Sequence, residues 1–478
     1  MRYNVNEQTT YERTLLMPFR LRQISPDDKL SHHLLLYVFK DCCPLEVVSE
    51  VLDECHGWEE RERKLNMVVI VYLIIAFSLF PLNNTVEVLS ELARGARFIW
   101  PDPSVQVPTK GAISSRRNQL KHGVMHRLVR RCCRPMATPQ TKGAFVLGLR
   151  IMAIDGTLQD VADVHETAQH FGRITSGKSA SPFPQMRCVY LAECATHAIV
   201  ASVKQPCSTS EQAMVWGLLH RIEPGMLITM DPGFFSALFI QEIQAKGAHV
   251  LGRLQSNMLM STPTRQQMLP DGSHLTVLTS KTVPGLRKPL TVRVIPYRIT
   301  GPGVPHAHEE QRLVTTLLDP NQISAQDLVA LYHERWEIEL IIDEQKTHLR
   351  LSQTALRSRT IKGCYQEMDG MLLAHYAIRH LMHQAALQGD VDPDRLSFTH
   401  AVHVVQRSLQ DFAQADPADH QALKERLLLD LRAEIVPVRT LRFVPRVVKR
   451  PLSSFRRKRW WHHPVHLKDR SFFDIFLI

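Results

Sequence analysis

The sequence predicts an α/β protein in which an all-α N-terminal region precedes a mixed sheet. From residue 29 to about residue 120, apolar residues recur at helical spacing. After a polar linker at 134–142 the pattern changes to short apolar runs, which are typical of strands. These runs and the periodic segments between them follow the order strand, strand, strand, helix, strand, helix, strand. A chain of 478 residues is long enough for about two to four domains.

Charge and composition limit the classes of protein. The formal net charge is +11, and residues 439–478 hold eleven Lys or Arg against two Asp or Glu. A basic chain suits a polyanionic partner, because basic side chains release counterions from nucleic acid. The longest apolar run, Met67–Phe80, is shorter than the roughly 20 residues that cross a bilayer, and no signal peptide is visible. We therefore expect a cytoplasmic protein without membrane contact, whose nine cysteines are reduced.

Residues 1–133 are expected to form an all-α N-terminal domain. Its helices are predicted at Pro44–Cys55, Arg61–Phe80, Val86–Arg94 and Ser114–Arg131. Because Arg and Lys accumulate toward the end of this region, DNA binding is one interpretation. A module for packing or dimerisation is the other.

Two acidic residues follow predicted strands in the segment 143–255. Asp155 follows the first strand of this segment, and Asp231 follows the fourth. The order of elements is that of an RNase H-like core, and strand ends of α/β sheets are where active groups are expected. The predicted strands are Leu147–Ile154, Arg187–Glu193, His197–Val203, Met226–Met230 and Val250–Leu254, and the predicted helices are Glu211–Ile222 and Phe235–Ala245.

The rest of the chain divides into three further segments. Residues 256–322 alternate turn residues with β-type runs, which indicates a β-rich insertion. Residues 323–390 are expected to complete the RNase H-like core, and their first helix is expected to run from the cap at Ser324 to about Leu351. Residues 391–478 are expected to form accessory helices and a basic tail.

One face of that helix carries an acid, a phenol and two cations. Tyr332, Arg335, Glu339 and Lys346 fall within roughly 60° of one another on a regular helix. A neighbouring apolar stripe can anchor the helix to the core while the polar face looks into a cleft. Most such faces are solvated ion pairs, so the face alone does not establish a site.

The spacing of these four residues resembles the Y-(2)-R-(3)-E-(6)-K signature of IS4 family transposases, which are DDE enzymes. The resemblance implies that Asp155, Asp231 and Glu339 are the catalytic, metal-binding triad. It implies two Mg²⁺ ions, for which Mn²⁺ can substitute. Tyr332, Arg335 and Lys346 would bind phosphates at the transposon end, and Arg335 and Lys346 would not pair with Glu339. Trp336, directly after the Arg, matches a tryptophan of relatives and would stack on a displaced base or pack in the core.

The resemblance also implies an activity and partners. The enzyme would nick double-stranded DNA at terminal inverted repeats, pass through a hairpin and transfer the strands into target DNA. It would act as a homodimer on paired ends, in the bacterial cytoplasm near the nucleoid. Two positions depart from the family pattern, Pro232 in place of an Arg and Leu313 in place of a Trp that stabilises the hairpin.

Several alternatives remain open at this point. A metal-dependent nuclease without strand transfer needs the same acids, and a transposase-derived DNA-binding protein without activity is a different class. Residues 172–179 match the sequence pattern of a phosphate-binding loop, which lies between a strand and a helix. Polar residues precede this segment and two prolines follow it, so no nucleotide cofactor is expected. His165 and His170 are one residue too far apart for a helical zinc motif.

Overall fold

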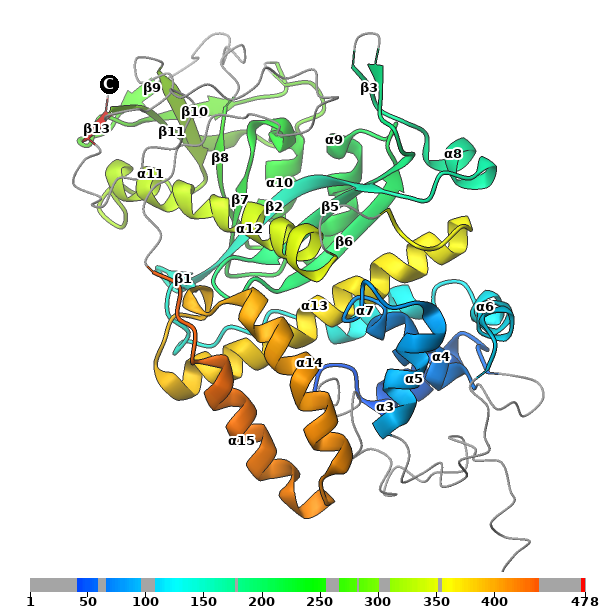
Figure 1. Cartoon of the computed structure of the whole chain (residues 1–478). Helices are drawn as coiled ribbons and strands as arrows, with labels where there is room; N and C mark the ends of the chain where they lie inside the picture. The colour runs from blue at the N-terminus through cyan, green and yellow to red at the C-terminus, as the bar shows by residue number, and fades with distance from the viewer. Residues whose placement is uncertain are drawn as a thin grey trace, which may run out of the picture.

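The computed structural model describes residues 41–58, 66–95, 108–176, 179–254, 266–281, 283–300, 310–350, 355–437 and 474–477. The basic stretch at 438–473 therefore lies outside the described residues. A large mixed sheet occupies the upper part of Figure 1, and the N-terminal and C-terminal helices lie below it. The long helix α13 (Ile361–Gly389) runs between these two parts.

The N-terminal region is helical, as predicted. Helix α4 is apolar on every side and buried along nearly its whole length, and the side chain of Asn66 caps it by accepting from Val69 N at 3.0 Å. The single helix predicted at Ser114–Arg131 is wrong, because Gly123 takes a φ of +91° and separates two helices. The helices are α3 (Leu45–Glu54), α4 (Met67–Ala76), α5 (Thr85–Gly95), α6 (Lys110–Gln119) and α7 (Val124–Cys132).

The central strands have the arrangement of an RNase H-like core. Strand β2 is parallel to β7, β7 is parallel to β8, and β5 and β6 extend the other edge in antiparallel order. The fold-class prediction is thus confirmed. The five strands are β2 (Leu149–Asp160), β5 (Gln185–Glu193), β6 (Ile199–Pro206), β7 (Met226–Met230) and β8 (His249–Arg253).

The β-rich insertion continues this sheet. Strand β12 pairs with β8 in antiparallel order, so the sheet reads β6-β5-β2-β7-β8-β12-β11-β10-β9. Strand β13 (Asp474–Leu477), near the end of the chain, pairs with β11, which the sequence did not predict. The open edge of β8 explains the continuation, because its backbone groups need partners. The inserted strands are β9 (Gln266–Met268), β10 (His274–Leu278), β11 (Leu290–Thr300) and β12 (Gln311–Thr315).

Helices cover both faces of the sheet. One layer contains α9 (Glu211–Met214), η3 (Val215–Arg221) and α10 (Ala237–Ala245). The other contains α11 (Ala325–His333) and α12 (Glu337–Asp343), which cross the face nearest the viewer in Figure 1. Strand β2 is buried on both of its sides from Ile151 to Ile154, as expected for a covered central strand.

The predicted continuous helix from Ser324 to Leu351 is wrong. A 3-10 turn, η5 (Glu334–Trp336), separates α11 from α12, and a π-helix, η6 (Glu344–Leu349), follows α12. Glu344 and Gln345 are both buried in this π-helix.

Helix α13 joins the lower and upper parts of the molecule. It contacts α4 and α7 on one side, and α14 (Phe398–Gln414) and α15 (His420–Leu431) on another. A Cβ at Gly370 would lie 2.6 Å from the carbonyl oxygen of Ile74, so only glycine lets α13 cross α4 this closely. One hydrophobic cluster runs from α3 through the sheet to α15, and the N-terminal helices share it.

Candidate active site

The parallel pairing of two strands brings Asp155 and Asp231 together. Ile154 of β2 lies opposite Met230 of β7. Asp155 and Asp231, the next residue along each chain segment, therefore follow at the same height of the sheet. Asp231 directly follows its strand, as predicted. Asp155 does not end its strand, because β5 keeps pairing with β2 as far as Asp160. The two acids still meet, because β7 stops beside Ile154.

Glu339 approaches the two aspartates from α12, which packs on β2. Arg335 lies between the acids, with Nη1 at 3.5 Å from Asp155 Oδ2 and Nη2 at 3.5 Å from Glu339 Oε1. Its guanidinium is nearly buried, whereas the Glu339 side chain is 37% exposed. The expectation that Arg335 does not pair with Glu339 is therefore wrong, because the two side chains, four positions apart, approach to 3.5 Å.

The carboxyl group of Asp155 holds its proton unusually well. Burial raises its pKa to about 6, and the charges of Asp231 and Glu339 act in the same direction. The N–H of Gly156, 2.7 Å from Oδ1, and the Arg335 guanidinium oppose this rise but do not cancel it. Three clustered acids with one guanidinium thus carry an excess of negative charge.

The donor atoms of this cluster suit a hard divalent cation. Carboxylate oxygens are the ligands that Mg²⁺ and Mn²⁺ prefer. Among the residues that the structure describes, no three His, Cys, Asp or Glu side chains already converge closely enough to hold a metal together. Arg335 separates Asp155 from Glu339, and the partly exposed Glu339 has room to move. Asp155, Asp231 and Glu339 are the residues that would bind the ion once the guanidinium swings aside.

Tyr332 is part of the core. Its side chain is 6% exposed, burial raises its pKa to about 12, and its hydroxyl donates to Met230 O at 3.4 Å. The carbonyl that accepts this bond precedes Asp231, so Tyr332 supports the end of β7. The Arg335 guanidinium lies 5.9 Å from the Tyr332 ring centroid.

Trp336 and Lys346 lie in different surroundings. Trp336 is 46% exposed, so its indole is not a core side chain, and Arg335 lies 6.0 Å from its ring centroid. Burial lowers the pKa of Lys346, while the nearby Cys188 and Asp160 raise it. Lys346 thus lies near Asp160, the last residue of β2.

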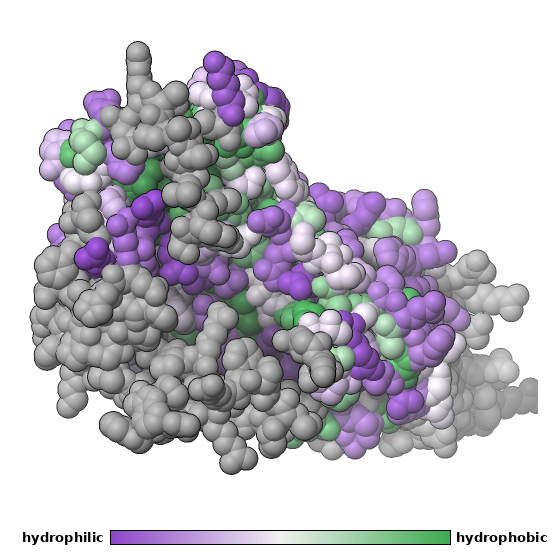
Figure 2. All heavy atoms as spheres, turned by 90° about the horizontal axis from the view of Figure 1, so that it is seen from above, coloured by the Kyte–Doolittle hydropathy of each residue, from purple (hydrophilic) through white to green (hydrophobic). Residues whose placement is uncertain are grey.

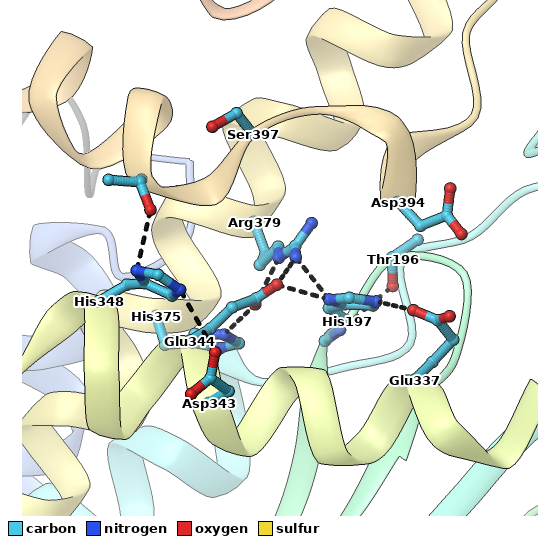
Figure 3. Close-up of polar contacts among 12 residues, drawn as sticks. Thr196, His197, Glu337, Asp343, Glu344, His348, His375, Arg379, Asp394 and Ser397 are labelled. Carbon is cyan, nitrogen blue, oxygen red and sulfur yellow. Dashed lines mark hydrogen bonds and ion pairs between the residues drawn. The ribbon is translucent and has the colours of Figure 1, made fainter. Parts of the chain in front are cut away.

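The sequence did not point to a buried polar network beside the site. Glu344 of η6 binds His197, His375 and Arg379, and His197 also binds Glu337 (Figure 3). The five residues come from three distant segments of the chain, and no motif or spacing marks them. Only the folded chain brings them together.

The two motifs that resemble cofactor sites take other forms. The described part of 172–179 contributes to a hairpin of β3 (Thr175–Ser176) and β4 (Ser179–Ala180), and a strand followed by a helix is not found there. His165 and His170 lie on α8 (His165–Phe171), where His170 Nε2 is 3.2 Å from the Tyr365 hydroxyl. Neither arrangement has the geometry of its motif.

Comparison with known proteins gives matches along most of the chain. Residues 147–376 match the model of the transposase DDE domain, and residues 34–130 match that of the insertion element 4 transposase N-terminal region. The transposase InsG for insertion sequence element IS4 of Escherichia coli (strain K12) is 27% identical, over 88% of this chain and 91% of that protein. The putative transposase InsZ of the same organism is 21% identical, over 44% of this chain and 69% of that protein.

A solved structure of a transposase aligns with most of this chain. The cryo-EM structure of the piggyBac transposase synaptic complex with hairpin DNA aligns at a TM-score of 0.43 and 13% identity, over 84% of this chain and 86% of that one. Within the described ranges, no helix has both the length and the apolar character to cross a membrane.

Proposed function

Because the chain belongs to the IS4 family of DDE transposases, we propose that it excises and inserts an insertion element by cutting and joining DNA at terminal inverted repeats. Asp155, Asp231 and Glu339 are the catalytic carboxylates of this proposal. The observation that supports it best is the meeting of these three acids, which come from β2, the end of β7 and α12, around one guanidinium.

DDE transposases use divalent metal ions, and we propose two Mg²⁺ ions, or Mn²⁺ in their place. When bound, such ions activate the attacking oxygen and neutralise charge on the leaving oxygen. Asp155 must lose its proton to act as a ligand, and its pKa of about 6 lets it do so near neutral pH. Arg335, displaced from the acids, is then placed to bind a phosphate of the scissile strand bidentately.

Side chains around the acids are proposed to hold the DNA end. Trp336 offers an exposed indole on which a displaced base can stack, and stacking suits a hairpin step. Leu313, the position where a relative carries a hairpin-stabilising Trp, is fully buried in β12 and cannot take that part. Lys346 and Tyr332 keep their proposed phosphate contacts, although the burial of Tyr332 makes support of β7 its first role.

A cationic cavity offers a second contact with the DNA backbone. A cavity of about 600 Å³ lies between the N-terminal helices and the start of α13. Among the described residues that line it, the one acid is Glu367, which already accepts from the backbone N–H groups of Arg357 and Ser358. The Nε of Arg117 is buried there without a hydrogen-bond partner in the described structure. The five cationic side chains that line the cavity are Lys110, Arg117, Arg350, Arg357 and Arg359.

The hydrophilic character of the wider surface suits a polar partner. Figure 2 shows the molecule from above, where hydrophilic side chains cover most of the described surface and apolar ones form only small patches. Residues 1–133 are proposed to supply DNA contacts, and 391–478 to supply accessory contacts. We propose a homodimer on paired ends, in the bacterial cytoplasm.

The deciding experiment incubates the protein with candidate inverted-repeat ends and Mg²⁺. Transposition predicts nicks at the element boundary, hairpin ends and joined products. Each of Asp155→Asn, Asp231→Asn and Glu339→Gln should reduce nicking more than about 10³-fold and leave end binding in place. Glu211→Gln is a matched control, since Glu211 lies against Gly156 on the opposite side of β2. It should stay within about threefold of the wild type.

Three other results would change the conclusion. Nicks without any joined product would favour a nuclease that lacks strand transfer. Binding without nicks under all conditions would favour a DNA-binding derivative. Nicking that survives in all three acid variants would contradict the triad.

A further inference from the structure

A buried carboxylate in the π-helix gathers hydrogen-bond donors from two other segments. Glu344 is 5% exposed, and its Oε2 accepts from His375 Nε2 and from Arg379 Nε, both at 2.9 Å. Its Oε1 lies 2.8 Å from His197 Nδ1 and also accepts from Arg379 Nη2. Figure 3 shows Glu344 between the imidazole of His197 and the guanidinium of Arg379.

His197 connects this carboxylate to a second one. Its Nε2 lies 2.9 Å from Glu337 Oε2, and the imidazole is fully buried. Its Nδ1 faces both Glu344 Oε1 and Arg379 Nη2, so one buried imidazole links all three partners.

The members of this network are hydrogen-bonded to one another. Glu344 contacts the guanidinium of Arg379 and the imidazoles of His197 and His375. Burial lowers the pKa of His375 to about 3, so this imidazole is neutral. A buried set of charges is tolerated when it is paired and hydrogen-bonded in this way, whereas removal of one member leaves a buried charge without a counterion.

The network connects the helix of Glu339 to the sheet that carries Asp155. Glu337 precedes Glu339 by two residues on α12, and Glu344 follows it by five. His197 belongs to the turn between β5 and β6, and Tyr190 of β5 pairs with Asp155 of β2. Arg379 and His375 add α13 to the same network. The helix is thus held at both ends, and Glu339 lies between the two attachment points.

We propose that His197 is a positioning residue for the reaction. Held between Glu337 and Glu344, it sets the position of α12 on the sheet and hence the distance from Glu339 to Asp155 and Asp231. This inference rests on the proposed role of Glu339 as a metal ligand. Outer groups that orient a ligand typically change metal affinity or activity by about 10- to 100-fold.

The positioning role is tested by metal binding without DNA. His197→Asn is suitable because His197 has a φ of +58°, which asparagine tolerates. Asp369→Asn is the matched control, since it breaks a buried ion pair with Lys204 that does not touch α12. His197→Asn should weaken Mn²⁺ binding, measured by electron paramagnetic resonance of the free ion, about 10-fold, and Asp369→Asn should stay within about twofold.

The outcomes separate this inference from the proposed function. Equal metal affinities in His197→Asn and Asp369→Asn would overturn the positioning role. Mn²⁺ binding that persists in Glu339→Gln would instead overturn the assignment of the metal ligand. If His197→Asn does not fold, Glu337→Gln takes its place, because it keeps the shape of the contact and removes one charge of the network.

Discussion

Arg335 forms an ion pair with Asp155, with Nη1 3.5 Å from Oδ2, and the same guanidinium reaches Glu339. A residue expected to bind DNA phosphates thus neutralises part of the charge of these acids in the structure. One guanidinium can serve both purposes if metal ions displace it toward the DNA. The positive charge of Arg335 partly neutralises the repulsion among Asp155, Asp231 and Glu339.

Removal of this guanidinium should change how activity depends on pH. Arg335 lowers the pKa of Asp155, so Arg335→Ala should raise that pKa further above 6. Because Asp155 must be ionised to bind metal, the rising limb of nicking against pH should move to higher pH, and Arg335→Lys should move it less. Arg335→Ala should also weaken binding of the DNA end more than binding of metal.

Arg187→Ala is the control for this profile. Arg187 pairs with Glu211 on the other face of β2 and should leave the pH midpoint in place. An unchanged midpoint in Arg335→Ala would contradict the electrostatic role of Arg335.

Asp155→Asn should stabilise the metal-free protein at alkaline pH. The folded-state pKa of about 6 is above the ordinary 3.8, so this group favours folding below pH 3.8 and loses that contribution as pH rises through 6. A shift of about two units corresponds to about 3 kcal/mol. In urea titrations with chelator, the free energy of unfolding of the variant should exceed that of the wild type by up to about 3 kcal/mol at pH 8. At pH 4 the two free energies should be nearly equal.

The control for stability is Asp163→Asn, whose carboxylate is 46% exposed beside Arg173. The difference in free energy of unfolding between Asp163→Asn and the wild type should not rise between pH 4 and pH 8. A gain for Asp155→Asn that is equal at pH 4 and pH 8 would show that burial does not hold the proton on Asp155.

Trp336 should act through stacking. Its indole is 46% exposed, and loss of a stacked base typically costs about 1–3 kcal/mol, or roughly 5- to 150-fold. Trp336→Ala should slow hairpin formation by this factor, and Trp336→Phe should restore most of it. The rate of the first nick should change little, and 2-aminopurine fluorescence at the end of the element would report the stacked base. Full hairpin activity in Trp336→Ala would assign the stacking to another side chain.

The cationic cavity should contribute to DNA binding through charge. Lys110 and Arg359 are exposed at its rim, so Lys110→Ala and Arg359→Ala should leave the fold intact. Each variant should reduce the slope of log K against log salt by about 0.9 if its side chain binds one phosphate. Arg287→Ala, an exposed arginine paired with Glu242, is the control. Equal slopes for all three variants would place the DNA elsewhere.

The predicted strands and helices of the core were largely correct, because each depends on local periodicity. The apolar runs before Asp155 and Asp231 mark β2 and β7, and the parallel pairing could be expected from their order. The irregular helix around Glu339 could not. Its 3-10 turn and π-helix accompany the burial of Arg335, Glu344 and Gln345. The amino-acid sequence of this segment fits a regular helix equally well.

Local patterns in the chain were thus enough for the fold class, for the three acids and for the family signature, because neighbours along the chain make them. The packing of distant segments determines how these residues act. It places Arg335 between Asp155 and Glu339 and joins Glu344 to His197, 147 positions away. Such contacts follow from burial and charge balance in the folded interior, to which no short pattern of residues corresponds.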